Sequence, residues 1–193
     1  MSTKLRVVVA EDEALIRLDL VEMLKEASYD VIGQAGDGQK AIELTEELTP
    51  DLVVMDIKMP KLDGISAAEK IAGARLAPVV ILTAFSQKDL VEKARDAGAM
   101  AYLTKPFTIN DLMPAIEVAV SRFSELKQLD KEITDLQEQL KARKTIEKAK
   151  GLLMKHLKIT EPEAFKWMQK TAMDKRRSMV DVANLVLEEY QNR

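Results

Sequence analysis

Residues 53–64 read VVMDIKMPKLDG, an apolar run that ends in Asp56 and is followed by a proline and a glycine. A short apolar run bounded by turn residues predicts a buried strand. Pro60 and Gly64 then predict a sharply turning loop directly after that strand. We therefore expect the loop to hold Asp56 at the edge of the core, where its carboxylate is open to chemistry.

Short apolar runs alternate with helical patterns over the first 123 residues. RVVVA, VIGQA, LVVMD, PVVILT and AYLTK predict five strands, and the first four are apolar almost throughout, as expected of parallel strands buried on both faces. The segments between them space their apolar residues by three and four, which predicts helices. The repeats predict an α/β fold with a doubly wound, five-stranded parallel sheet of flavodoxin-like architecture.

Polar side chains follow the predicted strands at the points where the strands end. They are Glu11 and Asp12 after the first strand, Asp56 at the third, Thr83 at the fourth and Lys105 after the fifth. In such a sheet, ligands bind outside the carboxyl ends of the strands. Clustered carboxylates repel one another unless a cation intervenes, and a hard cation such as Mg²⁺ prefers carboxylate oxygen. With a lysine and a hydroxyl nearby, one carboxylate could act as a nucleophile toward phosphorus.

The acidic pair, MDIKMPKLDG, Thr83 and TKPF resemble, in order and spacing, the receiver domain of two-component response regulators, over residues 4 to about 123. The resemblance implies that a sensor histidine kinase phosphorylates Asp56. It also implies a Mg²⁺ site, whose ligands are Glu11, Asp12, Asp56 and the backbone carbonyl of Lys58. Glu11 stands where an aspartate is commoner, and the Lys58 side chain occupies a position that tends to set the phosphoryl lifetime.

The resemblance also assigns a switch. Lys105 would pair with the phosphoryl oxygens and Thr83 would hydrogen-bond them, so these two residues and Asp56 would carry the phosphoryl transfer. Tyr102 would turn inward when Thr83 moves, and the Lys105–Pro106 peptide would be cis. The alternative for Tyr102 is simple packing on its strand. Apart from its own phosphorylation and dephosphorylation, we expect no enzymatic activity.

The helical pattern that begins at residue 109 continues beyond residue 123, through residues 124–144, which contain neither glycine nor proline. Its apolar residues then recur at steps of three and four: Leu126, Leu129, Ile133, Leu136 and Leu140. Such a heptad seam predicts a long, coiled-coil-like helix that pairs with a second copy. Because it spans only about two heptads, an amphipathic helix laid on its own chain is the alternative.

The last third of the chain is basic and helical. Residues 141–177 carry 12 basic and 4 acidic side chains, whereas the net charge of the whole chain is −3. Three helices are predicted over residues 143–157, 160–173 and 178–190, the last two with capping signals at Thr160 and Ser178. A basic surface on a small all-α module indicates nucleic acid, although solvated lysine faces are common.

RKTIEKAKGLLM, EAFKWMQKTAM and MVDVANLVL resemble the ANTAR module, a three-helix RNA-binding domain of transcription antiterminators, from about residue 130 to 190. We divide the chain into a receiver domain at 1–123, a helical linker at 124–142 and an ANTAR domain at 143–193. The predicted RNA contacts are Arg143, Lys144, Lys148, Lys150, Arg176 and Arg177. Trp167 is expected to pack in or beside the core, with stacking on an unpaired base as the alternative.

Together the two resemblances imply a phosphorylation-dependent antiterminator. It would bind RNA hairpins in nascent transcripts, act on transcribing RNA polymerase only indirectly, and form a homodimer when phosphorylated. One rival is a DNA-binding response regulator, but the tail lacks the strand-and-recognition-helix pattern of a winged domain. Another is a phosphatase or phosphotransferase using Asp56 as a turnover nucleophile, but Lys58 occupies the place where such hydrolases carry a second acid.

Composition excludes several other classes of site. The chain has no cysteine and a single histidine, His156, so it cannot form thiolate or histidine metal sites. It lacks an apolar run of about 18 residues, so no membrane insertion is expected. We expect a cytoplasmic location.

Overall fold

The structure is a computed structural model and describes residues 4–84 and 88–191. The chain forms two compact units, Met1–Gln128 and Leu129–Arg193. The finer divisions at residues 123 and 142 stay predictions.

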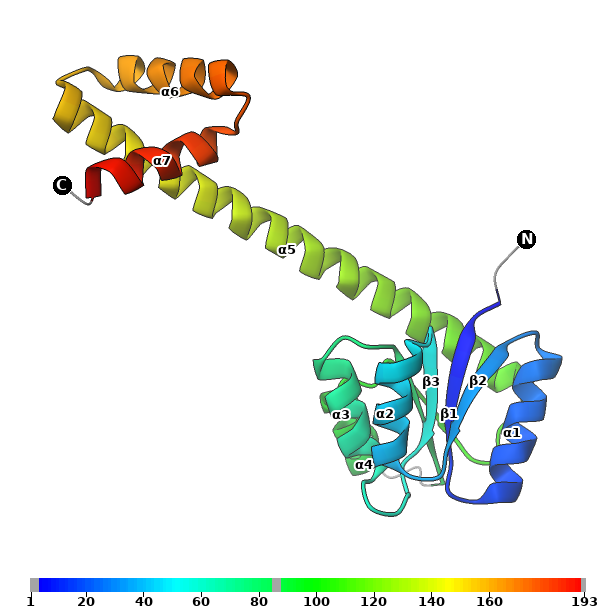
Figure 1. The fold of residues 1–193 in the computed structure, drawn as a ribbon. Coiled ribbons are helices and arrows are strands. Elements are labelled where there is room, and N and C mark those ends of the chain that lie inside the picture. The colour runs from blue at the N-terminus through cyan, green and yellow to red at the C-terminus, as the bar shows by residue number, and fades with distance from the viewer. Residues whose placement is uncertain (1–3, 85–87, 192–193) are drawn as a thin grey trace. The chain divides into compact units, whose positions relative to one another are not determined.

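The first unit alternates strands with helices. Its elements are β1 (Arg6–Ala10), α1 (Ala14–Glu26), β2 (Asp30–Ala35), α2 (Gly38–Leu48), β3 (Leu52–Asp56), α3 (Gly64–Gly73), β4 (Val79–Thr83), α4 (Lys88–Asp96), β5 (Ala101–Thr104) and the first part of α5 (Ile109–Leu157). The strands form one parallel sheet in the order β2-β1-β3-β4-β5 (Figure 1). The predicted doubly wound, five-stranded sheet is confirmed.

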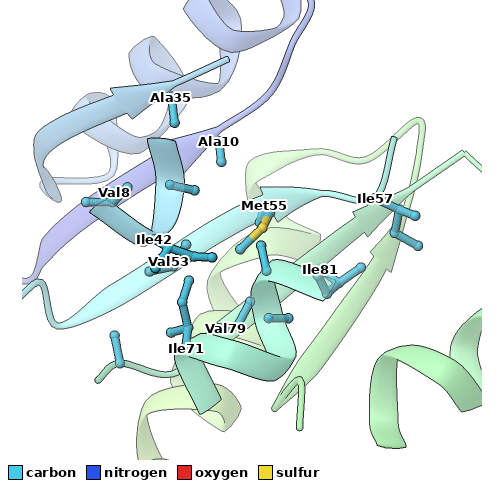
Figure 2. Close-up of a cluster of buried hydrophobic side chains, with 14 of the residues drawn as sticks. Val8, Ala10, Ala35, Ile42, Val53, Met55, Ile57, Ile71, Val79 and Ile81 are labelled. Atoms are coloured by element: carbon cyan, nitrogen blue, oxygen red, sulfur yellow. The ribbon is translucent and has the colours of Figure 1, made fainter. Parts of the chain in front are cut away.

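The central strands β1, β3 and β4 are buried on both faces of the sheet, and successive residues of each strand point to opposite sides. Val8, Val53 and Val79 face one side, where they meet Ile42 of α2 and Ile71 of α3 (Figure 2). Their neighbours along the strands pack against α1 and the first part of α5. Two apolar layers therefore hold the strands in a fixed register. The residues at the carboxyl ends of the strands are fixed in position as a result.

The second unit contains the rest of α5, together with α6 (Glu161–Lys175) and α7 (Met179–Gln191). Its core is formed by apolar residues of all three helices: Ala149, Leu153, Ala164, Met168, Ala172, Val182, Ala183 and Val186. The predicted long helix and the all-α module after it are confirmed.

The starts of α6 and α7 are set by their capping residues. The Glu163 carboxylate accepts hydrogen bonds from the backbone N–H and the hydroxyl of Thr160, at 2.8 and 2.7 Å. Asp181 does the same for Ser178, and the Asp181 N–H donates to the Ser178 hydroxyl in return. These bonds satisfy N–H groups that a helix start leaves without a partner, as the sequence pattern predicts.

Gly64 lets the loop after β3 fold back against its own strand. Its N–H donates to the carbonyl of Ile57 at 2.8 Å. A Cβ at this position would lie 2.0 Å from the carbonyl oxygen of Asp56, so no side chain fits. The glycine of the opening motif therefore permits the sharp turn that leaves Asp56 at the edge of the core.

We predict that Gly64→Ala lowers the free energy of unfolding by about 1–3 kcal/mol, because backbone must shift to admit the new methyl group. Gly73→Ala is the matched control: it lies in the same helix, and its Cβ would meet nothing within 4 Å. That change should leave stability unchanged or raise it by up to about 1 kcal/mol. Urea unfolding followed by circular dichroism measures both, and a Gly64→Ala protein as stable as wild type would disprove the clash.

Candidate functional site

Three carboxylates meet where β1 and β3 end. Oxygen atoms of Glu11, Asp12 and Asp56 all lie within 4.8 Å of one another. Glu11 is only 1% exposed and Asp56 is buried, whereas Asp12 is open to solvent. The structure thus brings together residues far apart in the sequence, as the strand-end pattern predicts. An oxygen-only set of this kind suits a hard cation such as Mg²⁺.

Lys105 places its ammonium group between two of these carboxylates. Its Nζ lies 2.6 Å from Glu11 Oε2 and 2.7 Å from Asp56 Oδ1. Burial lowers the pKa of Lys105, but hydrogen bonds to Asp56 and Glu11 outweigh burial, so the pKa is raised and the lysine stays charged. Burial raises the pKa of Glu11 and outweighs the opposing hydrogen bond from Lys105.

The other predicted residues surround a cavity of about 430 Å³ that opens onto Asp56 and is lined in part by Asp12, Lys58, Thr83 and Lys105. Thr83 is buried at the end of β4, and its carbonyl accepts the Lys105 N–H at 2.7 Å. The Lys58 N–H donates to Asp56 Oδ2 at 2.9 Å. Acid, hydroxyl and ammonium groups therefore belong to residues that line one cavity, and their roles stay predictions.

The two remaining switch residues lie outside this cluster. The Lys105–Pro106 peptide is cis, as the resemblance implies. Tyr102 on β5 is 49% exposed and lines a separate hollow together with Pro114 and Arg122. In this structure its ring is therefore turned outward, and the switch role stays a prediction.

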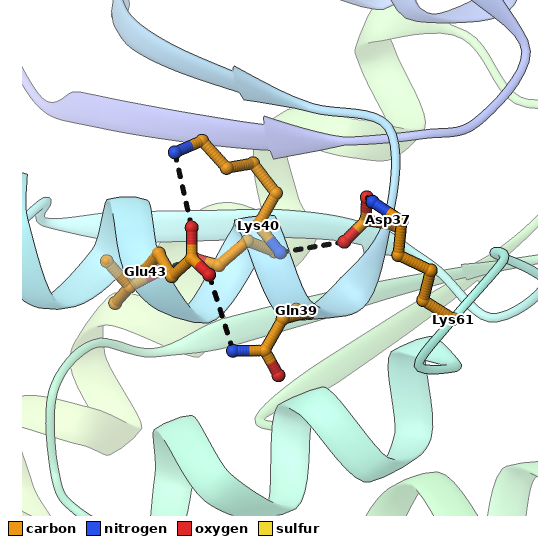
Figure 3. Close-up of polar contacts among 7 residues, drawn as sticks. Asp37, Gln39, Lys40, Glu43 and Lys61 are labelled. Carbon is orange, nitrogen blue, oxygen red and sulfur yellow. Dashed lines mark hydrogen bonds and ion pairs between the residues drawn. The ribbon is translucent and has the colours of Figure 1, made fainter.

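A cross-tie that the sequence analysis missed holds the loop after Asp56. Asp37 Oδ2 accepts from Lys61 Nζ at 2.7 Å, and Asp37 Oδ1 accepts from the Lys40 N–H at 2.8 Å, which caps α2 (Figure 3). The Gly38 N–H donates to the Leu62 carbonyl at 3.0 Å, and a Cβ on Gly38 would lie 2.4 Å from that oxygen. The dipeptide Asp-Gly before a helix was the only sequence signal for this contact.

Arg17 is a second residue that the sequence analysis missed. From α1 its guanidinium donates to the backbone carbonyl of Glu11 and, at 3.5 Å, lies at the limit of hydrogen bonding to that of Asp12. It therefore anchors the backbone that carries the acidic pair. Nothing in its sequence position distinguishes it from a solvated helix residue.

The predicted RNA-contact residues of the tail fall into two groups. Arg143, Lys144, Lys148, Arg176 and Arg177 are exposed. Lys150 is different: its side chain is 9% exposed, and its Nζ lies 2.8 Å from Glu147 Oε1 and 2.7 Å from Glu161 Oε1. Because two carboxylates already neutralise Lys150, we remove it from the proposed contacts and assign it to joining α5 to α6.

Two known protein families match successive parts of the chain. The response regulator receiver domain family matches residues 7–117, and the ANTAR domain family matches residues 134–187. Transcriptional regulatory protein PdtaR of Mycobacterium tuberculosis (strain ATCC 25618 / H37Rv) is 62% identical over 183 residues, which cover 95% of this chain and 89% of that protein. The chain belongs to the response regulator family. It is a two-component response regulator with a receiver and an ANTAR domain.

The receiver half of this response regulator has many further relatives. Chemotaxis protein CheY of Thermotoga maritima is 36% identical over 112 residues, which cover 58% of this chain and 93% of that protein. The signal receiver domain of the response regulator NarL from Mycobacterium tuberculosis superposes with a TM-score of 0.58 at 31% identity, covering 61% of this chain and 97% of that one.

Membership of the family gives the site a chemical context. Receiver domains bind Mg²⁺ at an acidic pocket, and Glu11, Asp12 and Asp56 form such a cluster here. The receiver domain implies a histidine kinase as partner, and the ANTAR domain implies RNA binding. None of the helices in the described part of the response regulator combines the length and hydropathy that a membrane span needs.

The cross-tie predicts a pH dependence of stability. The hydrogen bond from Lys61, followed by that from the Lys40 N–H, lowers the pKa of Asp37 in the folded state. A lowered folded-state pKa stabilises the fold above the unfolded-state pKa, about 3.9, and this contribution is lost as pH falls through the folded value. Asp37→Asn should therefore unfold at lower urea than wild type at pH 7, and the gap should close below about pH 4.

Urea midpoints measured between pH 2.5 and 7 test this expectation. Asp19→Asn, a change of the same kind at an exposed position on α1, is the control and should follow wild type throughout. A gap between wild type and Asp37→Asn that stayed constant down to pH 2.5 would contradict the assigned charge interaction.

Proposed function

We propose that phosphorylation of Asp56 by a histidine kinase switches this response regulator into a state that binds RNA hairpins and prevents transcription termination. The observation that carries the proposal is the ammonium of Lys105 held on both Glu11 and Asp56 in a chain whose tail matches the ANTAR domain. The first feature provides a phosphoryl-accepting site, and the second provides an output directed at RNA.

At the acceptor site, an Asp56 carboxylate oxygen forms a bond to phosphorus as the bond from phosphorus to the kinase histidine nitrogen breaks. Mg²⁺, when bound by Glu11, Asp12 and Asp56, would neutralise charge on the phosphoryl oxygens. Lys105 already contacts Asp56 Oδ1, so its ammonium is placed to pair with the incoming group. Glu11 keeps the lysine in position from the other side.

The signal would leave the site through β4 and β5. The Thr83 hydroxyl would turn toward the phosphoryl group and vacate space beside β5, and the outward ring of Tyr102 would move into that space. The two strands are neighbours, with Ile81 opposite Tyr102 and Thr83 opposite Thr104, which supports a direct connection.

A homodimer formed through α5 would be the next step. Leu129, Ile133, Leu136 and Leu140 are each 53–59% exposed, although large apolar residues at heptad spacing normally face a partner helix. Leu126, at the start of the seam, packs instead against the core of the first unit. The open part of the seam is short, so pairing should be weak until phosphorylation favours it.

Two rival functions are disfavoured by particular observations. A DNA-binding regulator of the winged type needs strands beside its recognition helix, and the described part of the second unit contains helices and connecting loops but no strand. Filter binding with hairpin RNA and duplex DNA separates these functions. A hydrolase that turns over at Asp56 needs a second acid where Lys58 stands, so we expect no turnover of small phosphate esters.

One prediction of the proposed function concerns the phosphoryl acceptor, Asp56. With acetyl phosphate and Mg²⁺, the wild-type chain should gain one phosphoryl group in intact-mass spectrometry, and Asp56→Asn should gain none because the amide is not a nucleophile. Asp12 and Glu11 remain in that variant, so they test whether another acid can replace Asp56. An adduct that persists in Asp56→Asn would place the phosphorylation elsewhere.

Assembly gives a second prediction. Ile133→Glu places a charge in the centre of the exposed seam, so it should weaken the phosphorylated dimer at least tenfold in sedimentation equilibrium. Glu138→Gln, an exposed position on the side of the helix opposite the seam, is the control. If the Ile133→Glu dimer were as tight as wild type, the interface would lie on another surface.

The basic tail gives a third prediction. Each phosphate that a lysine neutralises should add about 0.7–0.9 to the slope of log affinity against log salt. Lys144→Glu combined with Lys148→Glu should weaken binding to all hairpins and flatten that slope, because phosphate contacts carry no sequence information. Lys25→Glu with Lys70→Glu gives the same change of net charge on the first unit and should have a much smaller effect. If wild type and the tail variant had equal affinity and slope, Lys144 and Lys148 would not contact RNA and would be ordinary solvated surface residues.

A further inference from the structure

The C-terminal part of α5 carries a row of lysines with a glycine among them. Lys141, Lys144, Lys148, Gly151 and Lys155 follow one another at steps of three, four, three and four, so they lie along one face of the helix. All five positions are exposed. We call this set the lysine stripe.

Ion pairing distinguishes the lysines of the stripe from Lys150 in the described part of the chain. None of the four forms an ion pair there. Lys150, two residues after Lys148, faces inward instead and is held by Glu147 and Glu161. Lys144 and Lys148 are one helical turn apart, a spacing at which like charges destabilise a helix. A helix face that repels itself and lacks internal partners is suited to an anionic ligand.

Gly151 is the second, independent observation. Inside a helix, glycine is less favourable than any residue except proline, so packing normally has to justify it. At Gly151 packing does not, because a Cβ would meet nothing within 4 Å. Gly38 and Gly64 show the opposite case, since their Cβ atoms would lie 2.4 and 2.0 Å from backbone oxygens. Nothing in the described part of the unit fills the space beside Gly151, so the helix backbone there is open to a partner from outside.

We propose that the lysine stripe binds the sugar–phosphate backbone of the RNA and that Gly151 is the point where this backbone comes closest to the helix. The inference rests on the proposed RNA binding and adds the surface that performs it. Lys148 and Lys155 lie one turn or less on either side of Gly151, so their ammonium groups can hold phosphates flanking the contact. Lys141 and Lys144 line a hollow of about 470 Å³ that extends the surface toward Leu140.

A second copy of the chain is the other candidate for this face, because glycine also lets two helices approach closely. Charge argues against it. In a symmetric pair the stripe would meet its own copy, so the lysines would face lysines. The exposed apolar seam ends at Leu140, and the stripe begins at the next residue. The helix thus changes from an apolar to a cationic surface at this point, and an anion is the fitting occupant.

The test uses the full-length chain phosphorylated with acetyl phosphate and a hairpin RNA selected on the wild-type chain from a pool with randomised loops. Gly151→Gln adds an uncharged, helix-compatible side chain at the proposed contact. Gly73→Gln is the matched control, because Gly73 is also exposed in a helix with open space around it. Melting temperature, sedimentation and RNA affinity are measured for each.

We expect Gly151→Gln to melt at or above the wild-type temperature yet to bind the hairpin at least tenfold more weakly, and Gly151→Ala to bind a few-fold more weakly. Gly73→Gln should bind like wild type. Wild-type affinity in Gly151→Gln would overturn the inference and leave RNA binding intact, as would a changed dimer with unchanged RNA affinity. If the wild-type chain selected no hairpin, the proposed function itself would fail, and the inference with it.

Discussion

The site depends on the ion pairs that the Lys105 ammonium forms with Glu11 and Asp56. The sheet gathers three carboxylates at the ends of β1 and β3, with Glu11 almost fully buried, and such a cluster repels itself unless a cation lies within it. Lys105 supplies that charge from the residue after β5, on the far side of β4, and its Nζ lies 2.6 and 2.7 Å from two of the acids. In the function that we propose, the same lysine would also pair with an incoming phosphoryl oxygen, so one side chain would serve both the resting site and its chemistry.

The surrounding backbone keeps this cluster in place. Gly64 lets the loop after Asp56 fold against its strand. Asp37 and Lys61 tie that loop to the loop between β2 and α2. Arg17 holds the carbonyls of the acidic pair. None of these residues lines the cavity at Asp56. They restrict the freedom of the backbone beneath the acids, which is what a site that works by positioning and charge neutralisation requires.

Sequence patterns predicted the features that repeat or alternate. Strands such as LVVMD are apolar throughout because both their faces are buried, so the five-stranded sheet and the acids at its ends followed from the pattern, as did the exposed heptad seam. Contacts between distant residues were out of reach. Whether Lys150 faces solvent depends on Glu161, which reaches it only after the chain has turned into α6, and the pairing of Asp37 with Lys61 spans 24 residues. The sequence shows that a lysine stands at position 150, but the direction of its side chain depends on how α5 and α6 pack.

We propose a coupling between two sites, in which phosphorylation of Asp56 raises the affinity of the tail for RNA. Its most direct test is a titration of one selected hairpin with the full-length chain, before and after treatment with acetyl phosphate and Mg²⁺. We expect phosphorylation to tighten binding by about 5- to 150-fold, the usual range for coupling between two sites, and Asp56→Asn to bind alike under both conditions. Equal affinity of the phosphorylated and unphosphorylated wild-type chains would contradict it.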